Sequence, residues 1–205
     1  MGRHITAVCK LCRREKGKLF LKGQKCVTEK CPFGRRSYAP GQHGKLPIRT
    51  SEYGIRLREK QKARRIYGLT EGQFEKYFDM ASSGRGATGE QLLQLLERRL
   101  DNVVYRLGFA ASRSAARQLV HHGGINVNDC KTDIPSFLTK PGDVIQVRPK
   151  RAAVVKAVQD KAPDYVLPAW LTQKNEMEGQ VAALPTRDQI DTVVEEQMIV
   201  EYYSR

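Results

Sequence analysis

Positive charge is concentrated in the first third of the chain, and this limits what that third can fold into. Residues 1–65 contain 19 Lys or Arg against 4 Glu, a net charge of +15. Residues 66–97 carry −3, residues 98–156 carry +7 and residues 157–205 carry −5, so two basic blocks alternate with two acidic ones. Such asymmetry is the electrostatic footprint of a protein that binds a polyanion.

Nucleic acid is the polyanion that the rest of the sequence favours. A membrane surface would also attract the charge, but no lipidation signal or bulky amphipathic basic helix accompanies it. No run approaches the roughly 20 apolar residues that span a bilayer, and Met1 to Lys22 lacks the apolar core of a signal peptide. The sequence therefore predicts a cytoplasmic protein.

Four cysteines lie in an irregular N-terminal segment, residues 1–47, in which Arg35 to Gly44 is expected to form an extended arm. They form C-x2-C, thirteen residues, then C-x4-C: Cys9, Cys12, Cys26 and Cys31. Two close pairs of thiolates suit one tetrahedral structural Zn²⁺. Two disulfides and four unrelated thiols are the alternatives, and a reducing cytosol disfavours the first. Cys130 stands alone and is expected to be inert.

The centre of the chain reads as helical. A basic helix is expected from Ser51, its N-cap, to Ile66, and a second helix from a capping box at Thr70. Ser82 to Gly89 is a linker. A third helix is expected to begin at a second capping box, Thr88 and Gln91, and to end at Gly108, because apolar residues from Leu92 to Leu107 recur at helical spacing.

Short elements follow. Ser112 is expected to cap a helix that ends at Gly123 and Gly124, Ile125 to Asn128 alternates as a half-buried strand does, and Val144 to Val147 forms another strand. Residues 163–185 are expected to be loop-like. Helices followed by short strands, without βαβ alternation, predict an α+β fold.

The basic helix is a candidate RNA-binding element. Six of its residues are Lys or Arg, and Glu59 is the one local acid that could relieve their repulsion, so a phosphate backbone is expected to do so. Arg35, Arg36 and Arg49 of the preceding segment complete this candidate surface. The six helix residues are Arg56, Arg58, Lys60, Lys62, Arg64 and Arg65.

A second candidate surface lies on the short helix after Ser112. Arg113, Arg117 and His121 recur at i, i+4 and i+8, on one face, and the planar fork of Arg suits phosphate. A merely solvated charged face is the alternative. Because the apolar residues lie on another face, replacing Arg113 and Arg117 by Gln is expected to leave stability almost unchanged.

Enzyme signatures are missing. The sequence contains no G-x-x-x-x-G-K-[ST], G-x-S-x-G or H-E-x-x-H motif. Asp101 and Asp143 have no partner acid or histidine at a telling spacing and are expected to be capping or turn residues. The chain is predicted not to be an enzyme.

The most distinctive segment is RLDNVVYRLGFAASRSAARQLVHHGGINVN, Arg99 to Asn128, continued by DIPSF, Asp133 to Phe137, and KPGDVIQV, Lys140 to Val147. It resembles the small RNA-binding module of the bacterial ribosomal protein S4 family. SEYGIRLREKQKARRIYGLTEGQF, Ser51 to Phe74, RRSYAPGQHG, Arg35 to Gly44, and EEQMIVEYYSR, Glu195 to Arg205, resemble the rest of the family's chain.

This resemblance implies a structural component of the small ribosomal subunit. It would bind small-subunit rRNA directly, nucleate assembly of the 5′ domain, contribute to translational accuracy and touch ribosomal protein S5. A zinc-containing repressor of its own mRNA is the alternative. The implied division is a zinc-binding arm (1–47), a helical lobe (48–97, completed by 180–205), the RNA-binding module (98–160) and a connecting segment (161–179).

Two positions depart from the family pattern. Gly124 stands where the family often has histidine, and Asp129 follows Asn128 where the family often has glycine. Asp adopts the left-handed conformation less readily than Gly and adds a negative charge near the presumed RNA surface. The departures bear on the affinity of this edge, not on the fold.

Overall fold

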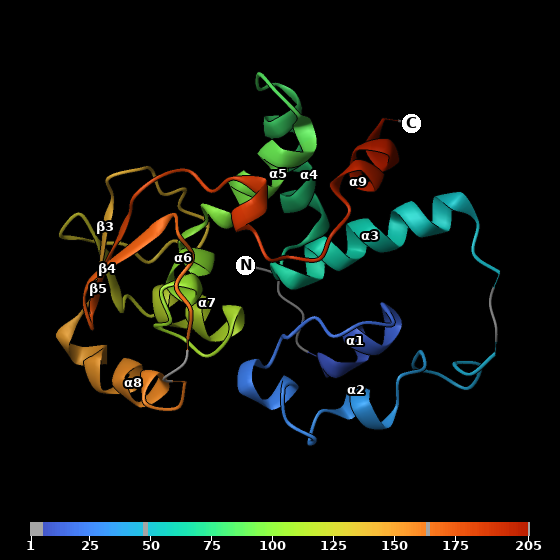
Figure 1. Cartoon of the computed structure of the whole chain (residues 1–205), viewed down its shortest axis with the longest axis horizontal. Helices are drawn as coiled ribbons and strands as arrows, with labels where there is room; N and C mark the ends of the chain where they lie inside the picture. The colour runs from blue at the N-terminus through green and yellow to red at the C-terminus, as the bar shows by residue number, and fades with distance from the viewer. Residues whose placement is uncertain (1–5, 47–48, 163–164, 205) are drawn as a thin grey trace. The chain divides into compact units, whose positions relative to one another are not determined.

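The computed structural model describes residues 6–46, 49–162 and 165–204, and it divides into two compact units. Unit 1 is Met1–Leu92 with Thr192–Arg205, and unit 2 is Leu93–Asp191 (Figure 1). Helices and a small antiparallel sheet confirm the predicted α+β class. The four predicted segment boundaries stay predictions, and the one at residues 47 and 48 lies outside the described residues.

Unit 1 is helical. Its elements are α1 (Cys9–Arg14), the 3-10 turn η1 (Gly23–Cys26), α2 (Pro32–Arg35), α3 (Glu52–Ile66), α4 (Glu71–Ser82) and α9 (Glu196–Tyr203), while α5 (Thr88–Glu97) spans the division between the units. The predicted cap of α3 is confirmed, since Ser51 Oγ accepts a hydrogen bond from the Gly54 N–H at 3.2 Å. The capping box expected at Thr70 is wrong, because its side chain accepts no hydrogen bond from α4.

The C-terminal helix α9 packs along α3 (Figure 1). Ile199 is fully buried, and the rings of Tyr53 and Tyr202 lie 5.5 Å apart. Tyr203 stacks on Phe78 of α4 at 4.3 Å between ring centroids. Residues far apart in the chain thus complete one helical core, through aromatic contacts of the offset or tilted kind that stabilise cores.

Unit 2 is a five-stranded antiparallel sheet with helices. The strand order is β2-β1-β3-β5-β4, and the helices are α6 (Leu100–Arg106), α7 (Arg113–His121) and α8 (Pro149–Gln159). The strands are β1 (Ile125–Val127), β2 (Cys130–Lys131), β3 (Val144–Val147), β4 (Leu171–Asn175) and β5 (Glu178–Val181), followed by the turn η2 (Arg187–Gln189). No helix in the described part of the chain is long and apolar enough to cross a membrane.

The core of unit 2 contains the residues that the apolar pattern predicted. Leu107, Ile125 and Val147 are buried, and Leu119 packs against them. Trp170, the single tryptophan of the chain, is 1% exposed in the same cluster. Its fluorescence therefore reports on unit 2.

The single helix expected from Thr88 to Gly108 begins at Thr88 as predicted, but its continuity is wrong. The chain breaks into α5 and α6 at Arg99, whose backbone is extended (φ −63°, ψ 136°) and pairs with Leu138. The Leu100 N–H donates to Phe137 O at 2.8 Å, and the Thr139 N–H donates to Arg98 O at 2.9 Å. These bonds to a distant loop replace helical ones, although the apolar spacing continues across the break.

The loop expected over residues 163–185 is also wrong, because it contains β4 and β5. Leu171 is the one buried residue of β4, and the buried positions of β5 are Gly179 and Val181. A Cβ on Gly179 would lie 2.4 Å from Leu107 Cδ2, so glycine is required where the strand crosses the core. Neither strand shows the alternation of apolar and polar residues by which a strand is recognised in a sequence. The helix α8 was not predicted either, because Val155 is its one buried residue.

The hairpin between β1 and β2 turns at Asn128 and Asp129, which have φ angles of 48° and 65°. Asp129 therefore adopts the left-handed conformation, as expected at a turn position that favours glycine. Asp143 is a turn residue, as predicted: its carboxylate accepts the Lys140 N–H at 2.7 Å and the Asn128 side-chain amide at 2.9 Å.

Candidate nucleic-acid interface

The six cations of α3 all have carboxylate partners. Arg56 pairs with Glu52 and Glu201, Arg58 and Arg65 with Glu15, Lys60 and Arg64 with Glu71, and Lys62 with Glu59. The prediction that Glu59 alone relieves the repulsion among these six cations is therefore wrong. Three of these acids come from other elements of unit 1, so this helix is neutralised within the protein before any RNA approaches.

Glu71, at the start of α4, is the most connected of these acids. Its carboxylate accepts Lys60 Nζ at 2.6 Å, Arg64 Nη1 at 3.1 Å and the Tyr203 hydroxyl at 3.1 Å. Burial alone would raise the pKa of Glu71, but Lys60, Tyr203 and Arg64 together hold the pKa below its ordinary value. Lys60 is 4% exposed and lies 4.2 Å from the Tyr202 ring centroid, so it anchors α9 and is not a free RNA ligand.

Glu15 connects the N-terminal arm to α3. Its side chain is 2% exposed and pairs with Arg58 at 3.4 Å and with Arg65. Burial raises the pKa of Glu15, against the opposing charges of Arg65, Arg58 and Arg14. This acid ties the arm, residues 6–46, to the basic helix, because both of its ion pairs are with arginines of α3.

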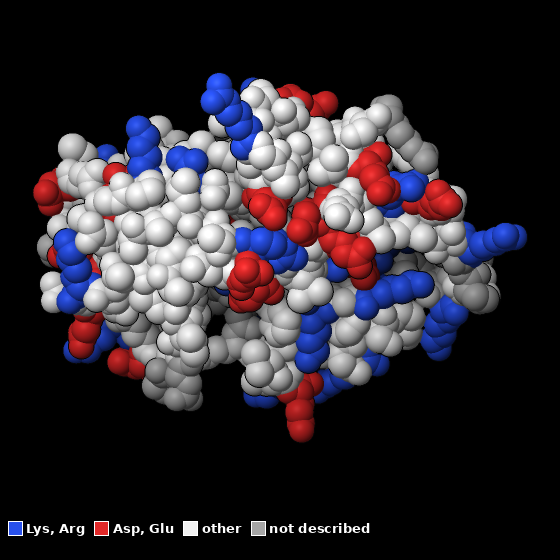
Figure 2. Space-filling model, turned by 45° about the horizontal axis from the view of Figure 1, so that its top comes forward, with Lys and Arg blue, Asp and Glu red and all other residues white. Residues whose placement is uncertain are grey.

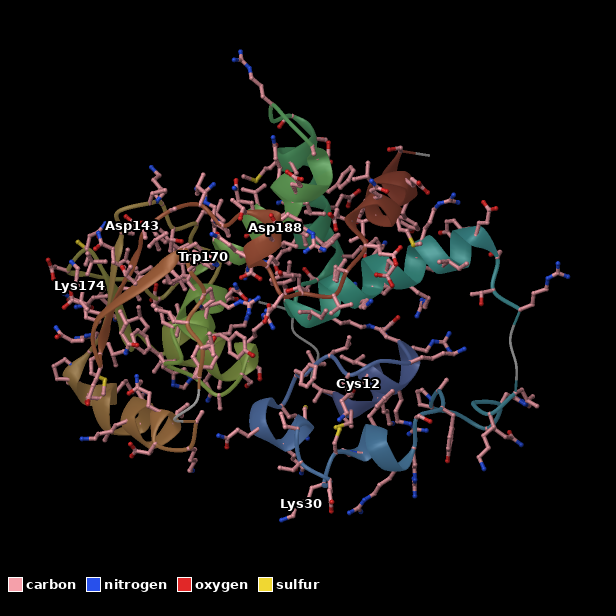
Figure 3. All side chains as sticks on the ribbon, in the orientation of Figure 1. Cys12, Lys30, Asp143, Trp170, Lys174 and Asp188 are labelled. Carbon is pink, nitrogen blue, oxygen red and sulfur yellow. The ribbon has the colours of Figure 1, made fainter. Side chains whose placement is uncertain are left out.

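The cations of the arm, together with Arg49, form a surface whose positive charge has no carboxylate partners within the described residues. Eleven Lys and Arg are exposed there, and within the described residues none forms an ion pair; Glu29 is the one exposed acid among residues 6–46. Figure 3 shows Lys30 projecting outward from this segment. The eleven, called here the arm cations, are Lys10, Arg14, Lys16, Lys18, Lys22, Lys25, Lys30, Arg35, Arg36, Lys45 and Arg49. Of these, sequence reasoning had singled out Arg35, Arg36 and Arg49.

The arm has internal order that holds these cations in place. Arg13 Nε donates to Tyr38 O at 2.9 Å, and its guanidinium carbon lies 5.1 Å from the Tyr38 ring centroid. Lys45 lies 5.2 Å from the same centroid. The segment Arg35 to Gly44 is thus tied back to α1, and the arm presents its charges from a folded surface.

The arginines of α7 lie in a buried charge network instead of facing water. Arg113 Nε donates to Asn102 Oδ1 at 2.7 Å, and Arg117 Nη1 lies 3.0 Å from Asp101 Oδ2. The alternative of a merely solvated face is therefore wrong. Replacing either arginine by Gln is now expected to lower stability, because each replacement removes a partner from a buried polar group. His121, one turn further on, is exposed.

Glu97 and Arg106 are the centre of this network. Glu97 is fully buried, and Arg106 binds its carboxylate with two hydrogen bonds of 2.9 Å. Asn102 donates to Glu97 Oε2 at 2.7 Å, and Asp191 lies 2.6 Å from Arg106. Burial disfavours the charged form of Arg106, but the two carboxylates outweigh it and raise its pKa.

Asp101 is the centre of a second group of buried ion pairs, with Arg99 and Arg117. It is 4% exposed, receives two hydrogen bonds from the buried Arg99 at 3.0 and 2.7 Å, and also pairs with Arg117. The capping role expected for Asp101 is therefore incomplete: it is an ion-pair residue in the first turn of α6. Polar residues four apart within an apolar helix, Asn102 and Arg106, were the available sequence signal.

The four arm cysteines share one region of unit 1. Cys12, Cys26 and Cys31 are buried, Cys9 is half-buried, and none forms a disulfide within the described residues. Figure 3 labels Cys12. Burial raises the pKa of Cys12, and the charges of Cys26, Cys9 and Cys31 raise it further. The donor set is one that zinc favours, but among the described residues no three His, Cys, Asp or Glu side chains converge closely enough to hold a metal ion.

The surface therefore contains two kinds of cation. Figure 2 shows a face on which several Lys and Arg side chains lie directly against Asp and Glu, while others project alone. The paired cations of α3 and α7 stabilise the protein, and the arm cations are available to a polyanion. Exposed, uncompensated positive charge gathered on one segment is the electrostatic footprint of a nucleic-acid-binding class of protein.

Comparisons with known proteins specify this class. Residues 3–97 match the ribosomal protein S4/S9 N-terminal domain, and residues 98–145 match the S4 domain. Small ribosomal subunit protein uS4 of Pelotomaculum thermopropionicum and that of Dictyoglomus thermophilum are each 57% identical to the chain, over 100% of both chains. The uS4 protein of Acetivibrio thermocellus is 55% identical over the same extent.

The chain belongs to the uS4 family of small ribosomal subunit proteins. This confirms the family that the sequence motifs indicated. It also confirms that the chain is a ribosomal protein and not an enzyme.

Proposed function

We propose that this chain is a structural component of the small ribosomal subunit in the cytoplasm, where it binds small-subunit rRNA directly. The observation that carries this proposal is the set of eleven exposed arm cations that form no ion pair within the described residues. They neutralise phosphates where RNA helices converge and fix the relative orientation of those helices. Affinity then comes mainly from counterion release, with shape giving selectivity.

Finer roles follow from family membership and rest on the same surface. The protein nucleates assembly of the 5′ domain of the rRNA, contacts neighbouring proteins including ribosomal protein S5, and contributes to translational accuracy. Within this proposal Arg113, Arg117 and His121 remain candidate RNA contacts, and His121 is the exposed residue of the three.

Salt dependence tests the proposed phosphate binding. The logarithm of the association constant for an rRNA 5′-domain fragment should fall linearly with the logarithm of salt concentration, with a slope of several units, because each neutralised phosphate contributes about 0.7–0.9. Titrations at four or more salt concentrations measure this slope. A slope near zero would show that stacking or hydrogen bonding carries the affinity, and the proposal would fail.

A repressor that binds its own mRNA is the second candidate. Contacts to phosphates alone carry no sequence information, so the same surface accommodates both RNAs. Sedimentation separates the candidates: a ribosomal component co-sediments with small subunits at near one copy each, whereas a dedicated repressor remains with mRNA.

We further propose one structural Zn²⁺, held by Cys9, Cys12, Cys26 and Cys31. The grouping of these four thiols in the arm supports it, and so does their spacing as two close pairs. Coordination requires the sulfur atoms to close to about 2.3 Å from the ion. Binding would deprotonate the thiols and tie α1, η1 and α2 together.

Metal analysis tests the zinc site. Protein purified under reducing, chelator-free conditions should contain about one zinc per chain. Cys26→Ser should lose the metal and loosen residues 6–46 while unit 2 stays folded, as the unchanged fluorescence of Trp170 would report. Cys130→Ser is the matched control, since Cys130 is exposed and lies outside the arm. Less than about half an equivalent in the wild-type protein would remove the claim.

A further inference from the structure

Phe20 is the one exposed Phe, Tyr or Trp among residues 6–46 of the arm. Its side chain is 48% exposed, whereas its neighbour Leu19 is buried. Tyr38, in contrast, is half-buried and already has the Arg13 guanidinium carbon 5.1 Å from its ring centroid. A single exposed apolar side chain is ordinary on a protein surface, and the backbone of Phe20 is what sets it apart.

The backbone of Phe20 is left-handed, with a φ angle of 49°. Glycine and asparagine adopt this conformation readily, but it costs free energy for a residue with a bulky side chain. The other non-glycine residues with positive φ in the described structure have a local reason. Lys16 follows the end of α1, and Asn128 and Asp129 form the turn between β1 and β2. A bulky aromatic residue in this conformation is an outlier of the kind that gathers at functional sites.

The buried thiols of the arm hold this backbone in place. On one side of Phe20, Leu19 forms a backbone hydrogen bond with the Cys12 thiol. On the other side, the Lys22 N–H donates to Cys26 Sγ at 3.4 Å. Hydrogen bonds to two buried thiols thus fix the chain on both sides of Phe20 and keep its ring at the surface.

Four of the arm cations lie within five positions of Phe20 in the chain, and all four are exposed: Lys16, Lys18, Lys22 and Lys25. Cations contact phosphates, whereas an aromatic ring offers a face on which a base stacks. The bases of an RNA duplex are already stacked on one another, so a protein ring reaches the bases of loops, bulges and ends. This combination of residues therefore fits an unpaired nucleotide better than a duplex.

We propose that the Phe20 ring stacks on an unpaired base of the rRNA while the neighbouring lysines contact the phosphates on either side of that base. The contact rests on the proposed function and adds a preference that phosphate contacts alone do not give. It makes the arm select single-stranded nucleotides over a plain duplex. The unfavourable backbone conformation of Phe20 is then offset by a contact made in the complex.

Phe20→Asn tests the stacking. Asparagine tolerates the left-handed backbone, so the arm of this variant should resist trypsin at least as well as the arm of the wild type. Binding to the rRNA 5′-domain fragment should weaken about 5- to 150-fold, the range for losing one stack between a base and an aromatic side chain. The log–log salt slope should stay unchanged, because no charge is removed.

Three comparisons isolate the ring. Phe20→Tyr keeps the aromatic face and should bind the fragment almost as tightly as the wild type. Val27→Asn is the matched control, because Val27 is 72% exposed in the same arm, and it should leave fragment binding almost unchanged. A fully paired RNA duplex should bind Phe20→Asn and the wild type equally, because its bases are not available to the ring.

The outcomes separate this contact from the proposed function. Wild-type affinity of Phe20→Asn for the fragment would overturn the stacking and leave phosphate binding by the arm intact. An equal loss in Val27→Asn, an equal loss on the duplex or faster cleavage of the arm would also overturn it, since the effect would then come from general contact or from misfolding. Failure of the wild-type protein to bind the fragment would overturn the proposed function and the stacking together.

Discussion

Arg106→Met is expected to lower the free energy of unfolding of unit 2 by roughly 3–5 kcal/mol, the range for breaking a buried ion pair from one side. The substitution leaves Glu97 fully buried with its charge opposed by Asn102 and by Arg113 at 3.9 Å. Methionine keeps the length and most of the volume, so little of the loss comes from a cavity. Urea unfolding monitored by Trp170 fluorescence measures the effect, because Trp170 lies in the core of unit 2.

A double variant separates the charge from the packing. Glu97→Leu with Arg106→Met removes both members of the pair and should be less destabilised than the sum of the two single variants, because no buried charge remains unpaired. Lys156→Met is the control, since an exposed substitution on α8 should change stability by less than about 0.5 kcal/mol. A loss below about 1 kcal/mol for Arg106→Met would mean that Glu97 takes up a proton or reaches water, and the network would lose its structural role.

Local signals predicted much of this fold. Ser51 and Ser112 cap their helices through their own hydroxyl groups, and Gly123 ends α7 at a positive φ of 63°. These features depend on a few consecutive residues, as capping and turn chemistry do. The buried faces around Leu107, Ile125 and Val147 followed from periodicity for the same reason.

Features that depend on distant residues escaped prediction. The carboxylates that neutralise α3 include Glu201, which is 145 positions from Arg56, and Glu15, which is 50 positions from Arg65. No pattern within the helix reveals such partners, so its charge was interpreted as free. The strand β5 was hidden because its close approach to Leu107 requires Gly179, which removes an apolar residue from the alternation.

The residues assigned to the candidate RNA-binding surface differ between sequence and structure for the same reason. Charge counting located the basic block in residues 1–65, but it could not divide the block into paired and unpaired cations. The helix with the densest charge is compensated by the fold, and the irregular arm, with the lower density, retains its charge. Only the tertiary structure assigns the ion pairs, and it thereby moves the main proposed RNA surface from α3 to the arm.

Neutralising four arm cations is expected to cause the largest loss of RNA affinity. Lys18, Lys22, Lys25 and Lys30 are exposed and form no ion pair within the described residues. Replacing all four by Gln should reduce the log–log salt slope by about 2.8–3.6 and weaken binding about 100-fold or more at 0.1 M salt. Titration of the rRNA 5′-domain fragment at several salt concentrations measures both quantities.

The matched control removes four charges from outside the arm: Lys76, Arg85, Lys140 and Lys156, all exposed. Net charge then falls equally in the two variants, so a general electrostatic attraction would weaken both to the same extent. A localised arm surface instead predicts that the control retains most of the wild-type slope. Equal slopes for the two variants would place the phosphates elsewhere. Unfolding would not explain that result, because exposed Lys→Gln changes seldom alter stability by more than about 0.5 kcal/mol each.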